Sequence, residues 1–117
     1  MIRGVVFDLD DTLYDYKSVN KIAVKALCEY TCNVLNITEG QFYDAFAKGK
    51  LLTKEMLVNT AAEHNRMLYC QKTLEVLGVK PALHALDMYE VYWQAMLEHM
   101  VLNDGVRELF DFLKSKL

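Results

Sequence analysis

The chain has 117 residues, 53% of them hydrophobic, and a formal net charge of -3 at pH 7. This length suffices for one modest domain with a buried core. The negative charge gives no reason to expect a nucleic-acid partner or an anionic membrane. No apolar run approaches the roughly 20 residues that a membrane-spanning helix needs, and MIRGVVFDLD lacks a signal-peptide pattern. Three cysteines are too few for a disulfide framework, so we expect a reducing, cytoplasmic setting.

The chain begins with its only segment typical of a β-strand, residues 2–9, which is apolar and has no helical period. Its composition indicates a strand buried on both faces, as in a parallel α/β sheet. Such a strand needs partners for its backbone hydrogen bonds, and the rest of the chain predicts none. We therefore expect this chain to be an incomplete part of an α/β fold.

Helices are predicted for most of the remaining sequence. Ser18 and Thr38 are plausible N-caps, and Gln41 is a capping-box partner for Thr38. Gly49 is expected to interrupt the second helix, and Gly78 to follow the end of the third. The predicted helices cover residues 18–35, 38–47, 53–77, 82–100 and 105–116.

Two groups of side chains on these helices have more than one interpretation. Cys28 and Cys32, four residues apart, share a helix face and could form half of a metal site, but packing thiols are the more ordinary interpretation. The spacing of Tyr89, Tyr92 and Trp93 on one helix side indicates a packed core more than a cofactor site.

Three carboxylates follow the predicted strand at Asp8, Asp10 and Asp11. Strand side chains alternate, so Asp8 and Asp10 are expected on the same side, at the sheet edge where α/β folds bind ligands. Two converging carboxylates repel each other unless a cation or a shared proton intervenes, and Mg²⁺ prefers such oxygen ligands. One carboxylate could attack phosphorus while its neighbour acts as general acid and base.

Two other interpretations of this acidic cluster are weaker. A solvated surface loop would not continue directly from a buried apolar run. An EF-hand would require Gly and Glu where this sequence has Leu13 and Val19, and a helix in front of the loop.

The segment FDLDDTL, residues 7–13, resembles motif I of the haloacid dehalogenase (HAD) superfamily, hhhDxDxT. The resemblance implies an α/β fold: a HAD-like Rossmannoid core with an inserted α-helical bundle cap. Residues 1–16 would supply the first core strand, the catalytic loop and the hinge called squiggle and flap. Residues 17–100 would form the helical cap, and residues 101–117 would return into the core.

The resemblance also implies roles for the residues of the motif. Asp8 would be the nucleophile that forms an aspartyl-phosphate, and Asp10 would protonate the leaving oxygen and then deprotonate water. The Asp8 carboxylate and the Asp10 backbone carbonyl would hold Mg²⁺. Leu9 and Thr12 would belong to the phosphate-binding turn, and Asp11 would be structural.

The later motifs of the family, a Ser or Thr, a Lys and an acidic pair, would lie beyond residue 117. We therefore expect the N-terminal portion of a longer enzyme, inactive without the missing C-terminal core, which could also be a separate chain.

The resemblance to capped members of the family also implies that residues of the cap select the substrate. Our candidates are His64, Asn65 and Arg66, because they bring a cation and hydrogen-bond donors into an apolar helical region. The Arg66 guanidinium would bind a phosphate or carboxylate in bidentate fashion. An exposed polar face is the alternative, and Lys50 is a weaker candidate of the same kind.

The function expected from the sequence is that of a Mg²⁺-dependent phosphatase acting on a small phosphorylated metabolite. The alternatives are a non-catalytic binding or interaction module that retains the motif, and a phosphomutase or phosphotransferase. These last two use the same aspartates but transfer the phosphoryl group to another hydroxyl.

Overall fold

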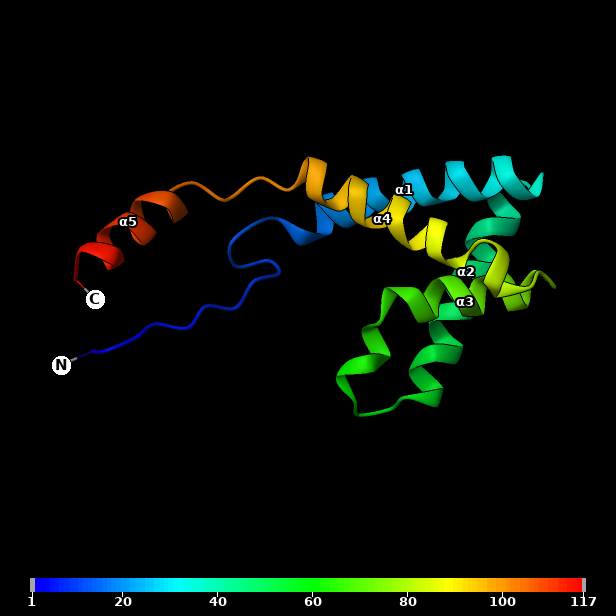
Figure 1. Ribbon diagram of the computed structural model, residues 1–117, viewed down its shortest axis with the longest axis horizontal. Coiled ribbons are helices and arrows are strands. Elements are labelled where there is room, and N and C mark those ends of the chain that lie inside the picture. Colours follow the sequence, from blue (N-terminus) through cyan, green and yellow to red (C-terminus); the bar gives the residue numbers. More distant parts are fainter. Residues whose placement is uncertain (1, 117) are drawn as a thin grey trace.

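The computed structural model describes residues 2–116. Met1 and Leu117, which limit the predicted ranges 1–16 and 101–117, lie outside the described residues. Four helices pack into one body and a fifth lies apart from them (Figure 1). The molecule is elongated, with extents of 57 × 29 × 21 Å. The helices are α1 (Tyr16–Leu35), α2 (Glu39–Met56), α3 (Arg66–Val76), α4 (Ala85–His99) and α5 (Val106–Lys116), with short 3₁₀ helices η1 (Ala61–His64) and η2 (Pro81–Leu83).

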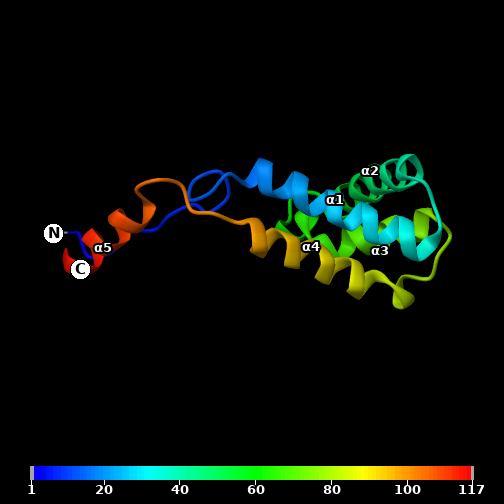
Figure 2. The same ribbon diagram turned by 90° about the horizontal axis from the view of Figure 1, so that it is seen from above.

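The helical body consists of two packed pairs. Helix α1 runs alongside α4, and α2 packs against α3 (Figure 1). The N-terminal segment and α5 extend together from one end of this body (Figure 2). They meet where the rings of Phe7 and Phe110 pack edge to face, 5.5 Å apart.

The prediction of an α/β fold with a Rossmannoid core is wrong for this chain. Residues 2–116 form no strand or sheet, only two isolated β-bridges, and the fold is all-helical. Residues 2–9 form no strand, because no second strand lies beside them to complete a ladder of backbone hydrogen bonds. The predicted burial is absent as well, since Val6 is 97% exposed and Leu9 54%. None of the described helices is long and apolar enough to cross a membrane.

The beginnings of the first two helices follow from local hydrogen bonding. The Thr38 capping box is confirmed, with Thr38 Oγ1 accepting from Gln41 N and Gln41 Oε1 accepting from Thr38 N. Ser18 is not an N-cap, because α1 begins two residues earlier. Asp15 takes that place, and its carboxylate accepts from the backbone N–H and the hydroxyl of Ser18. These hydrogen bonds lower the pKa of Asp15.

Gly49 does not interrupt α2, which continues through it to Met56. The residue is buried where α2 meets α3. A Cβ at this position would lie 2.8 Å from the backbone nitrogen of Thr73 and 2.9 Å from its hydroxyl. Glycine therefore serves close helix packing here and does not mark a break.

The predicted helix over residues 53–77 is instead divided into two. A turn and η1 separate α2 from α3, and the Asn65 side chain caps α3 by accepting from Leu68 N. Gly78, with a φ of +73°, follows the end of α3 as predicted.

The core lies between α1, α2, α3 and α4. Tyr92 is buried there, which confirms the core interpretation of this aromatic residue. Cys28 and Cys70 are buried too, and burial raises the pKa of Cys70 to about 12. The largest fully buried side chains are Tyr14, Tyr92, Phe42, Leu27, Leu74, Met88 and Met96.

Replacement of Gly49 by alanine tests the close contact between α2 and α3. We expect Gly49→Ala to lower the free energy of unfolding by about 1–3 kcal/mol, because the backbone of Thr73 must move to admit the methyl group. Gly40→Ala in the same helix is the matched control. Its Cβ would have no neighbour closer than 3.9 Å, so stability should be unchanged or rise by up to about 1 kcal/mol. Urea unfolding followed by circular dichroism measures both, and equal stabilities would contradict the packing argument.

Candidate functional site

The three carboxylates lie on a tight turn that precedes α1. The Leu9 carbonyl accepts from Thr12 N at 3.3 Å and from Leu13 N at 3.0 Å. Asp11 adopts a left-handed conformation with a φ of +58°, which Asp tolerates better than most residues. The Thr12 hydroxyl donates to Asp8 Oδ2 at 2.9 Å. The turn thus exposes both Asp8 and Asp10 to solvent and fixes one oxygen of Asp8.

Tyr14 orients the second aspartate and was not singled out from the sequence. Its side chain is only 2% exposed, and its hydroxyl donates to Asp10 Oδ1 at 2.6 Å. Burial and the adjacent Asp10 carboxylate raise the pKa of Tyr14 far above its usual value, so it remains a hydrogen-bond donor at neutral pH.

The turn is attached to the segment between α4 and α5. Asn103 N donates to the Leu13 carbonyl at 2.8 Å, and Asn103 Nδ2 donates to the Thr12 carbonyl at 3.1 Å. Tyr14 also forms an antiparallel β-bridge with Leu102. Residues 102–103, about 90 residues further along the sequence, therefore hold the carboxylate turn in place.

Asp10 shares a hollow with the three residues predicted to select the substrate. This hollow has a volume of about 290 Å³, and Asp8, Leu9 and Thr12 do not line it. Trp93 contributes to the wall, and its indole nitrogen is buried without a hydrogen-bond partner among the described residues. The lining residues are Asp10, His64, Asn65, Arg66, Tyr89 and Trp93.

Arg66, the first residue of α3, is held by groups from three parts of the chain. Its Nε donates to the Tyr92 hydroxyl at 3.1 Å, and its terminal nitrogens donate to the Tyr16 hydroxyl and the His64 carbonyl. The guanidinium carbon lies 5.4 Å from the ring centroid of Tyr69 and 5.6 Å from that of Tyr92. Arg66 is therefore partly buried among aromatic rings, which excludes a freely solvated polar face for this side chain.

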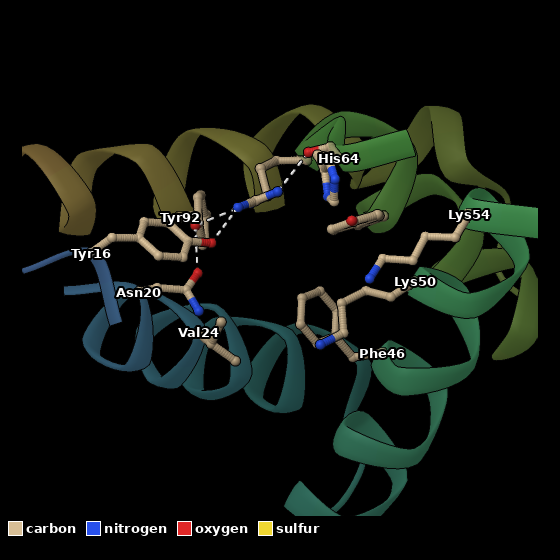
Figure 3. Close-up of a pocket in the computed structure, with 10 residues that line it drawn as sticks. Tyr16, Asn20, Val24, Phe46, Lys50, Lys54, His64 and Tyr92 are labelled. Atoms are coloured by element: carbon tan, nitrogen blue, oxygen red, sulfur yellow. Dashed lines mark hydrogen bonds between the residues drawn. The ribbon is translucent and has the colours of Figure 1, made fainter. Parts of the chain in front are cut away.

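A second cavity of about 160 Å³ adjoins the first, because His64 and Arg66 line both. Lys50 and Lys54 enter it from α2, opposite Tyr16 and Tyr92 (Figure 3). The Lys50 ammonium lies 5.0 Å from the Phe46 ring centroid. The cavity is lined by Tyr16, Asn20, Val24, Phe46, Lys50, Lys54, His64, Arg66, Tyr69 and Tyr92.

Lys50 was a candidate from the sequence, but Tyr16, Asn20 and Lys54 were not, although their spacing carried a signal. Tyr16 and Asn20 are four residues apart, as are Lys50 and Lys54, so each pair lies on one helix face. What the spacing could not indicate is that these two faces point at each other. Tyr92 connects the α1 face to Arg66, since its hydroxyl accepts from Arg66 Nε and donates to Asn20 Oδ1 at 2.7 Å.

The chemistry of Asp8 and Asp10 fits a partial Mg²⁺ shell. Residues 2–116 hold no group of three or more His, Cys, Asp or Glu side chains that could enclose a metal ion. Mg²⁺ commonly uses one or two carboxylates and completes its shell with water and substrate phosphate. The side-chain hydrogen bond of Asp8 uses only one of its carboxylate oxygens, so this exposed carboxylate keeps lone pairs for a ligand.

Removal of the Tyr92 hydroxyl tests how much this network stabilises the protein. We expect Tyr92→Phe to lower the free energy of unfolding by about 1–3 kcal/mol, because Arg66 Nε and Asn20 Oδ1 each lose a partner. Tyr89→Phe on the same helix should change it by less than about 0.5 kcal/mol. Thermal and urea unfolding of both variants measure the difference. An unchanged free energy of unfolding in Tyr92→Phe would show that water replaces the hydroxyl.

Comparison with known proteins finds a similar phosphatase. The chain is 31% identical, over 118 aligned positions, to a ribulose-1,5-bisphosphate 5-phosphatase from Halopiger xanaduensis. The match covers 99% of this chain and 49% of that protein, so the chain spans about half the length of this curated relative. Neither a family model nor a solved structure matches the chain.

Proposed function

We propose that this chain is part of a phosphatase that hydrolyses a phosphorylated sugar through an aspartyl-phosphate. One structural observation carries the proposal: Asp10, from the motif-like turn, shares a hollow with His64, Asn65 and Arg66. A candidate acid–base group thus lies beside a cation and hydrogen-bonding groups that suit a sugar phosphate. The similarity to a protein named as a sugar-bisphosphate phosphatase supports the same chemistry.

Asp8 and Asp10 would divide the reaction between them, in the manner of the HAD-like phosphatases that the turn resembles. An Asp8 oxygen attacks phosphorus, the bond from phosphorus to the sugar oxygen breaks, and Asp10 gives its proton to that oxygen. Asp10 then takes a proton from water as the water attacks phosphorus. Inorganic phosphate leaves, and the Asp8 carboxylate is restored.

The hydrogen bonds of the turn suit these roles. Thr12 holds one Asp8 oxygen, so the other has no side-chain hydrogen bond and is free to attack. Tyr14 donates to one Asp10 oxygen, so the other is the one that can carry the transferred proton. Both aspartates are exposed, which gives a substrate and water access to them.

Mg²⁺ would be held by the Asp8 carboxylate and the Asp10 backbone carbonyl. When bound, it neutralises part of the negative charge of the phosphoryl oxygens and the carboxylates. The helical body would select the sugar through His64, Asn65 and Arg66. We further propose that turnover requires residues in addition to these 117, which supply further contacts to the phosphoryl group.

Substitution of the two aspartates tests the mechanism in the natural polypeptide that contains this sequence. We expect Asp8→Asn to abolish sugar-phosphate hydrolysis, with a loss in kcat/KM of more than about 10⁴-fold, because the nucleophile is gone. Asp10→Asn should cost about 10²–10⁴-fold, the usual contribution of a general acid and base. Asp11→Asn is the matched control and should cost less than tenfold, since Asn also tolerates a positive φ.

The products distinguish the alternatives. Release of inorganic phosphate, measured with and without Mg²⁺, supports a hydrolase. Transfer of the phosphoryl group to a second hydroxyl would instead identify a phosphotransferase or mutase. Equal activities of Asp8→Asn and the unmodified protein would refute the proposed nucleophile, and the absence of turnover in every context would favour a binding module.

A further inference from the structure

The cavity beyond Arg66 concentrates positive charge without an opposing carboxylate. Lys50, Lys54 and Arg66 line it together with His64, and within residues 2–116 no acidic side chain joins them. The salt bridges of the described chain involve other lysines, Lys25 and Lys72, and the pair His64–Glu63. Three cations around one small cavity repel each other, so the arrangement is unfavourable until an anion enters.

The charge of Lys50 already responds to this crowding. Burial lowers its pKa, and the positive charges of Lys54 and Arg66 lower it further. Lys50 lies over the ring of Phe46, so its ammonium group has exchanged part of its hydration for an aromatic face. An anion in the cavity would raise the pKa of Lys50 again, because its negative charge would offset the positive charges of Lys54 and Arg66.

Arg66 is held in place while part of its hydrogen-bonding capacity remains free. A guanidinium has five N–H donors, and Arg66 directs three of them to Tyr92, Tyr16 and the His64 carbonyl. Each terminal nitrogen therefore keeps one N–H for a ligand. Because the side chain is already ordered, an anion would bind it at a smaller cost in conformational entropy.

The cavity has the size and position for a second phosphate group. Its volume of about 160 Å³ is several times the roughly 30 Å³ that one water molecule occupies in the liquid. It adjoins the hollow that contains Asp10, through the shared residues His64 and Arg66. The two hollows are therefore neighbours on either side of these two side chains.

We propose that the cavity formed by Lys50, Lys54 and Arg66 binds the non-reacting phosphate of a substrate that carries two phosphates. The reacting phosphate lies at Asp8 and Asp10, so this part of the inference rests on the proposed function. The two lysines supply charge, and Arg66 supplies directed hydrogen bonds. The substrate class is a sugar bisphosphate, and a monophosphate lacks the group that the cavity recognises.

Binding experiments test the cavity without relying on catalysis. The 117-residue chain is titrated in EDTA with a pentose 1,5-bisphosphate, the matching 5-phosphate and inorganic phosphate, and followed by ¹⁵N NMR and calorimetry. We expect shifts at residues 50, 54 and 66, with the bisphosphate bound most tightly. Lys54→Met should weaken bisphosphate binding by about 10- to 100-fold, as expected for the loss of a charge-assisted hydrogen bond.

Lys48→Met is the matched control, because Lys48 is exposed on the same helix and lines neither cavity. It should bind the bisphosphate as the unmodified chain does, and melting temperatures check that both variants fold. Equal bisphosphate affinities for Lys54→Met and Lys48→Met would overturn the inference. Inorganic phosphate bound as tightly as the bisphosphate would also overturn it, in favour of a site for free phosphate.

Turnover of the natural polypeptide separates this inference from the proposed function. Lys54→Met should raise KM for the bisphosphate by about tenfold or more, leave kcat within a few-fold, and leave KM for the monophosphate unchanged. If hydrolysis occurs and Lys54→Met changes KM for neither substrate, the cavity assignment fails and the proposed hydrolase function stands. If the cavity binds bisphosphate but Asp8→Asn turns it over normally, the proposed nucleophile fails and the cavity assignment stands.

Discussion

The arrangement of the helical body depends on a cation that has no carboxylate partner within residues 2–116. Arg66 begins α3, and its guanidinium donates to Tyr16 of α1 and Tyr92 of α4. Three helices therefore meet at one planar group. A partly buried charge is costly unless its donors are satisfied, and here neutral hydroxyls, one carbonyl and aromatic rings provide this. Because none of these partners is negative, the positive charge of Arg66 remains available to a ligand.

Because its partners are uncharged, Arg66 can hold the helices together and still attract an anionic ligand. A salt bridge to an acid would have stabilised Arg66 equally well but would have cancelled its field in the cavity. The tyrosine hydroxyls fix the orientation of the guanidinium and leave its charge unneutralised. Lys50 and Lys54 increase the same field, at some cost in mutual repulsion. Stability is thus lost locally and would be regained when an anion binds.

Some features set by neighbouring residues could be predicted from the sequence, although Ser18 was mistaken for the N-cap that Asp15 supplies, and features set by distant partners could not. The Thr38 capping box needs only residues three apart, and it is present as predicted. Gly49 was interpreted by its helix propensity, whereas its role depends on Thr73, a residue of another helix. The strand over residues 2–9 failed for a related reason, because a strand exists only where a partner completes its hydrogen bonds. Arg66 was identified as a candidate, but its tyrosine partners and its position beside Asp10 are long-range facts.

The position of the carboxylate turn relative to the helices depends on few contacts. Asn103 and Leu102 hold the turn from the segment after α4, and Tyr14 anchors it in the core while binding Asp10. The segments on the far side of the turn, residues 2–9 and α5, touch the helical body little and leave apolar side chains such as Val6 and Phe112 exposed. The distance between Asp10 and Arg66 is therefore controlled mainly by residues 10–16 and 100–103.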